Sequence, residues 1–262
     1  HIEAPTVAGG SLEAIIRHCE EDASCTKAYP DLRQEAIDVI DRYDAEPVAI
    51  EVIHPQTGES LTMMLTGHRV AQGILMLNSQ TPTVGMVPMF IHRLAAGDTE
   101  IAKEMVWAIA PPSGSFSWAL GTSIFCMEYS DFLEEEIVFP GIFPAYEKSI
   151  ATQSFGGTTI ARTCAMWGVD PIDRRYKNPV RADVPVLLMA GTLDSLTPPS
   201  WAHEVAETLP NSHVIEIEGF AHSPTFASEC TAMMALQFFA DPSQAPDASC
   251  LAEMKIAFAV PE

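Results

Sequence analysis

Residues 185–190, Pro-Val-Leu-Leu-Met-Ala, form an uninterrupted apolar run that is typical of a strand buried on both faces of a parallel sheet. Two adjacent prolines that follow it, at residues 198 and 199, can start a helix over residues 201–209. A second strand is predicted over residues 213–218, and a second helix over residues 229–240. This order predicts an α/β fold, with the two strands paired in parallel through a right-handed crossover.

Two strands are too few for a parallel sheet, which needs several strands and a covering on both faces to bury its backbone. The first residue is His1, and neither an initiator methionine nor a leader-type apolar segment stands at the start of the 262-residue sequence. We therefore expect most of the sheet to come from polypeptide upstream of His1. The strand–helix unit would then be the C-terminal portion of a larger sheet.

The first 178 residues have a different pattern, because their apolar side chains recur mostly at helical spacing. We predict helices within residues 11–46, with Ser11 as an N-cap, and over 67–77, 84–96 and 99–110, together with a small β-hairpin of residues 48–52 and 60–65. The chain thus divides into a mainly helical region, residues 1–178, and the strand–helix unit with its tail, residues 179–262.

The charge balance excludes several classes of partner. The chain has 35 acidic and 14 basic side chains, for a formal net charge of −21. This charge repels phosphate backbones and anionic lipid surfaces, so we expect no nucleic-acid partner and no membrane partner. The segment His-Glu-Val-Ala-Glu from His203 lacks the second histidine of a zinc-protease motif. The sequence therefore predicts no metal site, and we expect no cofactor.

The six cysteines are an even set without a Cys-x-x-Cys pair, which argues against zinc ribbons and thioredoxin-like redox sites. Three disulfides are the leading interpretation, and six buried free thiols are the alternative. Fifteen connectivities are open, of which nearest-neighbour pairing has the lowest contact order: Cys19 with Cys25, Cys126 with Cys164, and Cys230 with Cys250. Disulfides indicate an oxidising compartment, so we expect a secreted or periplasmic protein.

Reactive side chains follow both predicted strands. Asp194 comes after the first strand in Gly-Thr-Leu-Asp, and His222 comes after the second in Gly-Phe-Ala-His. Functional residues of open parallel sheets lie just beyond the carboxyl ends of the strands, so we expect these two side chains to meet. A carboxylate placed in this way holds an imidazole in one tautomer while the imidazole takes the proton of a nucleophile. The sequence therefore predicts the acid and the base of a catalytic triad.

Several longer segments carry a family resemblance. They are Val-Pro-Val-Leu-Leu-Met-Ala-Gly-Thr-Leu-Asp-Ser-Leu-Thr-Pro-Pro around Asp194, Gly-Phe-Ala-His-Ser around His222, and Asp-Ala-Ser-Cys ending at Cys250. The region before them contains a Cys-x5-Cys pair followed by Tyr-Pro-Asp-Leu, then Phe-Cys-x-Glu ending at Glu128, and Cys-x-x-Trp. Together these segments resemble the tripeptidyl aminopeptidase-like α/β hydrolases, relatives of proline iminopeptidase.

This resemblance implies the C-terminal portion of an α/β-hydrolase parallel sheet with a large, mainly helical cap, or lid, inserted before it. It implies that Asp194 and His222 belong to a Ser–His–Asp triad, and that the cysteines pair as nearest neighbours. An aminopeptidase must bind the ammonium group of its substrate, and a cap carboxylate can do so through a charge-assisted hydrogen bond. Glu128 is our candidate for this contact, and an ordinary exposed glutamate beside a disulfide is the alternative.

The chain departs from the family in lacking the Gly-x-Ser-x-Gly elbow that carries the nucleophile. The segments around Ser11 and Ser123 lack the closing glycine, and Ser113 and Ser115 stand in a proline-rich connector. We therefore expect the N-terminal half of the hydrolase, with the nucleophile, to be another chain or a missing segment.

The function that follows is a serine hydrolase that releases short peptides or amino acids from peptide N-termini. A carboxylesterase acting on short acyl esters is one alternative, since the same residues cleave esters. A catalytically incomplete fragment that acts as a binding module is the other.

Overall fold

The computed structural model of the chain describes residues 3–55, 57–108, 117–129, 137–152 and 157–261. Its helices are α1 (Ala4–Glu21), α2 (Ala23–Ala28), α3 (Leu32–Ala45), α4 (Gly67–Asn78), α5 (Thr81–Val84), α6 (Val87–Ala95), α7 (Glu100–Ala108), α8 (Trp118–Tyr129), α9 (Pro144–Ala151), α10 (Gly157–Trp167), α11 (Pro199–Ala206) and α12 (Glu229–Ala240). Its strands are β1 (Val48–Ile53), β2 (Ser60–Leu65), β3 (Val186–Gly191) and β4 (Ser212–Ile217). Short 3-10 helices cover Arg174–Lys177, Pro224–Phe226 and Ser249–Glu253.

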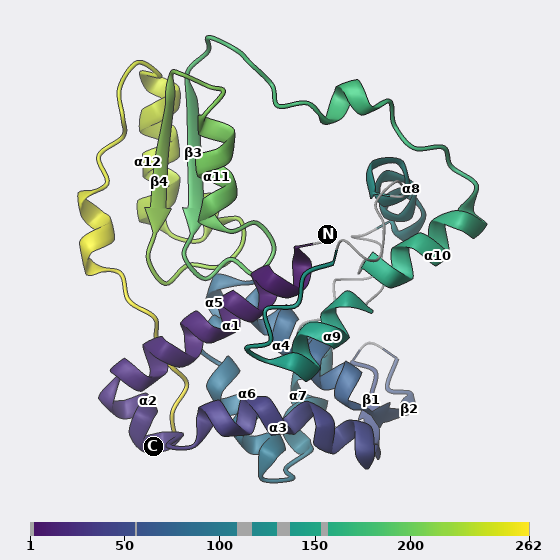
Figure 1. Cartoon of the computed structure of the whole chain (residues 1–262). Coiled ribbons are helices and arrows are strands. Elements are labelled where there is room, and N and C mark those ends of the chain that lie inside the picture. The colour runs from purple at the N-terminus through teal and green to yellow at the C-terminus, as the bar shows by residue number, and fades with distance from the viewer. Residues whose placement is uncertain (1–2, 56, 109–116, 130–136, 153–156, 262) are drawn as a thin grey trace.

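Strands β3 and β4 form the predicted parallel pair, with Val186 opposite Ser212 and Gly191 opposite Ile217. Helices α11 and α12 flank them, and the carboxyl ends of both strands point towards α1 and α5 (Figure 1). The alternating order of strands and helices fits an α/β fold. The expected burial on both faces is wrong for this sheet, because residues 186–189 are only partly buried. Within the described residues β3 pairs with a strand along one edge alone, so its other edge has no neighbouring strand.

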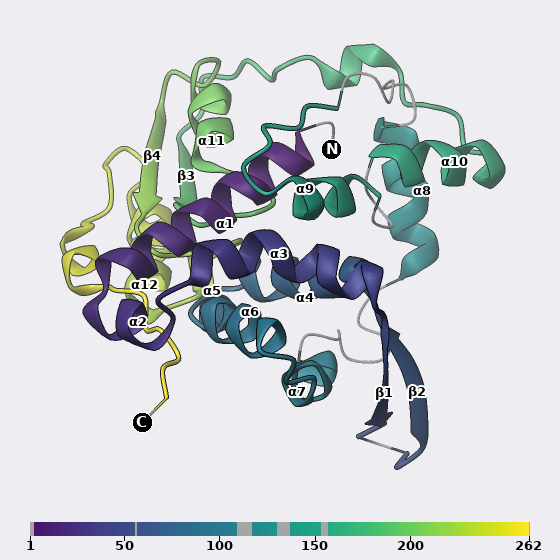
Figure 2. The ribbon, with the colours of Figure 1, turned by 60° about the horizontal axis from the view of Figure 1, so that its bottom comes forward.

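A helical core lies beside this sheet. Apolar side chains at helical spacing place Leu12 and Ile16 of α1, Ile40 of α3, Ile74 of α4 and Ile91 of α6 in one buried cluster. Figure 2 shows α1, α3, α4 and α6 layered against one another, with the β1–β2 hairpin at the far end of α3. The hairpin is antiparallel as predicted, with Val48 opposite Leu65. None of the helices in the described ranges has both the length and the apolar character needed to cross a bilayer.

Two helix boundaries differ from the prediction. Ser11 is not an N-cap, because α1 begins at Ala4, where Pro5 provides a favourable first turn, and Ser11 lies inside the helix with 6% of its surface exposed. The predicted helix over residues 84–96 is divided at Gly85 and Met86, and α6 starts with Pro88 in its first turn. Residues 109–110 of another predicted helix, and Ser113 and Ser115, lie outside the described residues.

All three predicted disulfides are confirmed: Cys19–Cys25, Cys126–Cys164 and Cys230–Cys250. The second one joins α8 to α10, and among the described residues the small cluster around it holds one further buried side chain, Ile160. In both overall views this helix pair lies apart from the sheet (Figures 1 and 2).

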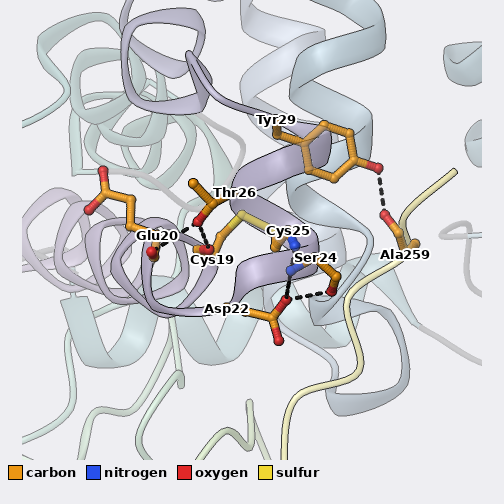
Figure 3. The surroundings of a disulfide bond; sticks show 8 residues. All are labelled: Cys19, Glu20, Asp22, Ser24, Cys25, Thr26, Tyr29 and Ala259. Atoms are coloured by element: carbon orange, nitrogen blue, oxygen red, sulfur yellow. Dashed lines mark hydrogen bonds between the residues drawn. A yellow bond between two sulfur atoms is a disulfide. The ribbon is translucent and has the colours of Figure 1, made fainter.

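Around the first disulfide, hydrogen bonds hold the turn between α1 and α2 (Figure 3). The Thr26 hydroxyl is 2.9 Å from the carbonyl oxygens of both Cys19 and Glu20, and Asp22 caps α2. The Tyr29 hydroxyl donates to the carbonyl oxygen of Ala259 at 2.5 Å. The C-terminal tail is thereby attached to the helical core.

Candidate active site

Asp194 lies in the loop after β3 with 3% of its surface exposed. Its Oδ1 accepts hydrogen bonds from the backbone N–H groups of Leu196 and Thr197, each at 2.8 Å. Its Oδ2 accepts one from the Thr197 hydroxyl, also at 2.8 Å. Hydrogen bonds within the local turn are therefore enough to orient this carboxylate, without a contact from elsewhere in the chain.

His222 lies in the loop after β4, and its ring meets this carboxylate. Its Nδ1 is 2.9 Å from Oδ2 of Asp194 and 3.0 Å from the Thr197 hydroxyl oxygen. An ionised carboxylate only accepts hydrogen bonds, so Nδ1 carries a proton in this contact. The Nε2 atom of the neutral ring is then the one that can accept a proton, as a general base requires. The predicted meeting of Asp194 and His222 is thus present in the structure.

The pair changes the pKa of both groups. The hydrogen bond and the negative charge of Asp194 raise the pKa of His222 above its usual value, against the opposing effect of burial. Burial disfavours the charged form of Asp194, but the hydrogen bonds from His222, Thr197 and Leu196 outweigh it and lower the pKa of the carboxyl group. The site is therefore set up for a carboxylate beside an imidazole that gains a proton readily.

Two unusual backbone positions shape the loops. A Cβ atom on Gly191 would lie 2.3 Å from the carbonyl oxygen of Phe220, so the close approach of the two loops requires glycine there. Ser223, directly after His222, is the one non-glycine residue with a positive φ among those described, at 55°. Left-handed backbone costs roughly 1–2 kcal/mol for an L-residue and is often found at functional sites.

A pocket of about 400 Å³ opens beside the half-exposed ring of His222. It is lined by Ser79, Gln80, Thr81, Pro82, His222, Ser223, Phe226 and Ala227. Its walls therefore come from the turn between α4 and α5 and from the loop after β4. Among the residues described, the hydrogen bonds of the His222 ring all use Nδ1, and none of them involves a serine hydroxyl.

The serines of the incomplete elbow motifs have other contacts. The Ser11 hydroxyl is 2.7 Å from the carbonyl oxygen of Leu193. The Ser123 hydroxyl, on α8, bonds the carbonyl oxygen of Ala119 at 2.9 Å and accepts from the indole of Trp167 at 3.0 Å. Neither serine contacts His222.

Glu128 is exposed on α8, next to the Cys126–Cys164 disulfide. Figures 1 and 2 both place α8 apart from the carboxyl ends of β3 and β4. The structure therefore brings Asp194 and His222 together but does not bring Glu128 to them.

Sequence reasoning missed Thr197 and the pocket residues from the α4–α5 turn. Thr197 had a usable signal, because a threonine three residues after an aspartate often hydrogen-bonds in a local turn. Ser79 and Thr81 had none, since they lie more than 100 residues from the loops they contact. Within the described residues, no group of three or more histidine, cysteine, aspartate or glutamate side chains could hold a metal ion.

Comparison with known protein families matches residues 152–250 to the family described as TAP-like protein, a family of α/β hydrolases. The matched segment contains β3, β4 and both residues of the Asp194–His222 pair. Searches of curated proteins and of solved structures each find no match. Residues 152–250 are therefore similar to the tripeptidyl aminopeptidase-like α/β hydrolases.

Proposed function

We propose that this chain provides the general base and its orienting carboxylate to a serine peptidase that cleaves short peptides or amino acids from peptide N-termini. The observation that carries the proposal is the contact of His222 Nδ1 with the buried Asp194 carboxylate, beside an open pocket. The family match supports a hydrolase, and its relation to tripeptidyl aminopeptidases favours peptides over esters.

The proposed reaction is acyl transfer. Nε2 of His222 takes the proton of a serine hydroxyl as its oxygen attacks the carbonyl carbon of the substrate. The protonated imidazole, stabilised by Asp194, then gives this proton to the leaving amine as the peptide bond breaks. A water molecule hydrolyses the acyl-enzyme by the same two proton transfers in reverse, which restores the serine.

The serine is proposed to come from a second polypeptide segment, the N-terminal half of the hydrolase. Two observations support this: the sequence lacks a Gly-x-Ser-x-Gly elbow, and the described serines leave the His222 ring without a serine partner. In the same proposal residues 1–178 act as the cap, since the turn between α4 and α5 forms one wall of the pocket. A secreted or periplasmic location fits the three disulfides.

A fluorophosphonate probe, which labels activated serines, tests the proposal. The purified, non-reduced 28.4 kDa chain is treated alone and together with the candidate N-terminal half, and intact masses are measured before and after. We expect an adduct only when the second segment is present, and only on that segment. The His222→Ala variant should abolish it. An adduct on a serine of residues 1–262, or labelling that survives His222→Ala, would overturn the proposal.

The same assembly, not treated with the probe, is then assayed with aminoacyl and tripeptidyl anilides and with short acyl esters. Faster cleavage of anilides with a free amine than of their N-blocked forms supports the peptidase. Cleavage of esters alone supports the carboxylesterase. Binding of peptides without labelling or turnover at any serine supports the binding module.

A further inference from the structure

Ser79, in the turn between α4 and α5, and Thr81, the first residue of α5, contact the loop that carries His222. The backbone N–H of His222 donates to the carbonyl oxygen of Ser79 at 3.3 Å. The N–H of the fully buried Ala221 donates to the Thr81 hydroxyl at 3.1 Å. A buried N–H needs a hydrogen-bond partner, and here a side chain 140 residues away in sequence is that partner.

The same turn reaches the loop that carries Asp194 through α1. The Ser11 hydroxyl lies 2.7 Å from the carbonyl oxygen of Leu193 and 3.0 Å from the side-chain amide of Asn78. Ser11 therefore joins the end of α4 to the carbonyl that directly precedes Asp194. Tyr146 of α9 is buried beside the same amide, and burial raises the pKa of its hydroxyl.

The Ser11 hydroxyl lies within hydrogen-bond distance of both the carbonyl that directly precedes Asp194 and the side-chain oxygen of Asn78. Among the described residues, the side-chain nitrogen of Asn78 and the hydroxyl of Tyr146 have no hydrogen-bond partner. Asn78, Tyr146 and Ser11 are all buried, with 0%, 0% and 6% of their surfaces exposed. Buried hydrogen bonds are strong because the protein interior has a low dielectric constant, so the bonds of Ser11 can hold the Asp194 loop in one position.

We propose that Ser11, Asn78 and Thr81 are positioning residues that hold the Asp194 loop and the His222 loop against the same end of α4. They do not touch the reacting atoms. Their effect is to fix the distance between the carboxylate and the imidazole, which lie in two separate loops after β3 and β4. The inference rests on the proposed function of that pair, and its structural part can be measured without turnover.

The test is a ¹³C NMR titration of His222 in the full chain, with the resonance assigned by a His222→Gln variant. Thr81→Val removes the acceptor of the Ala221 N–H. Thr81→Ser keeps the hydroxyl and should titrate as the wild type does. Thr83→Val is the matched control, because among the described residues the Thr83 hydroxyl bonds only the nearby carbonyl oxygens of Leu77 and Gln80.

We expect Thr81→Val to weaken the contact with Asp194 and to lower the pKa of His222 towards its ordinary value. Ser11→Ala should lower it as well, through the loop of Asp194, and it decides the question if Thr81→Val does not fold. The inference is overturned if Ser11→Ala and every folded Thr81→Val sample leave the titration of His222 unchanged, even with a lowered melting temperature.

Failure of the proposed function and failure of the positioning role give different experimental results. An Asp194→Asn variant in the same titration shows how far the pKa of His222 falls when the whole contact is lost. If the His222→Ala assembly still reacts with the probe, the proposed function fails, while the titration still decides whether Ser11, Asn78 and Thr81 position the pair. If the probe result holds but the titration does not move, only the positioning role fails.

Discussion

The Nδ1 atom of His222 lies 2.9 Å from Oδ2 of Asp194, although 28 residues separate the two in sequence. The parallel pairing of β3 and β4 produces this relationship, because it ends both strands at the same edge of the sheet. The carboxylate is held by Leu196 and Thr197 as well, so its position does not depend on the imidazole alone.

An Asp194→Asn variant tests two effects of the carboxylate: the raised pKa of His222 and the fixed tautomer of its ring. The amide cannot hold a positive imidazolium as the carboxylate does, so the pKa of His222 should fall. In the assembly that contains the nucleophile, kcat should fall by about 10⁴-fold, as expected when a triad loses the residue that fixes the tautomer. Steady-state kinetics with a tripeptidyl anilide provide the measurement. A variant within tenfold of the wild type would contradict the triad role.

The pH dependence of stability follows from the same pair. The pKa of Asp194 is lowered from 3.8, so its contribution is present above that pH and is lost as the pH falls through the folded-state value. The pKa of His222 is raised from 6.5, so its contribution is present below that pH and is lost as the pH rises through the folded-state value. Urea unfolding should therefore show the largest difference between wild type and Asp194→Asn between pH 3.8 and 6.5. A difference that keeps growing above this window would contradict the assignment.

The sequence predicted what depends on short-range patterns. The apolar run, the prolines before α11 and the spacing of reactive residues were enough to place β3, β4 and the Asp194–His222 pair. The disulfides could be predicted because each joins sequence neighbours among the six cysteines. The start of α1 was missed because Ser11 has the features of a cap, whereas its hydroxyl serves a contact with Leu193 far along the chain. Such contacts depend on how helices pack, which local patterns do not encode.

Glu128→Gln tests the ammonium contact for which the sequence makes Glu128 the candidate, although α8 lies apart from the carboxyl ends of β3 and β4. If Glu128 binds the free amine of a substrate, the variant should raise KM for free-amine peptides about tenfold, as expected for a lost charge-assisted hydrogen bond, and should leave KM for short esters unchanged. Glu253→Gln, an exposed glutamate outside the pocket, is a suitable control. An equal change for peptides and esters would show that Glu128 has no part in recognising the amine.

The Cys126–Cys164 disulfide should be the main tie between α8 and α10, because Ile160 is the only other fully buried side chain of their cluster in the described residues. Replacing both cysteines with alanine removes a cross-link whose chain-entropy contribution is about 4 kcal/mol. Hydrogen exchange should then quicken in α8 and α10 but not in α11 and α12. The double alanine variant of Cys230 and Cys250 is the control, and it should leave α8 and α10 protected. Unchanged exchange in α8 without its disulfide would contradict this view.

Alanine substitutions at two helical glycines, one buried against another helix and one exposed, test how closely the helical core packs. A Cβ atom on Gly67 would lie 2.2 Å from the carbonyl oxygen of Ile40 and 2.6 Å from the Asp44 carboxyl group, so Gly67→Ala forces α3 and α4 apart. The free energy of unfolding should fall by about 1–3 kcal/mol, the usual cost of overpacking. Gly10, on the exposed side of α1, has no atom within 4 Å of such a Cβ. Gly10→Ala should therefore raise the free energy of unfolding by roughly 0.5–1 kcal/mol, because alanine loses less backbone entropy in a helix. Urea denaturation of the two variants checks both signs, and a Gly67→Ala variant as stable as Gly10→Ala would show that α3 and α4 do not pack this closely.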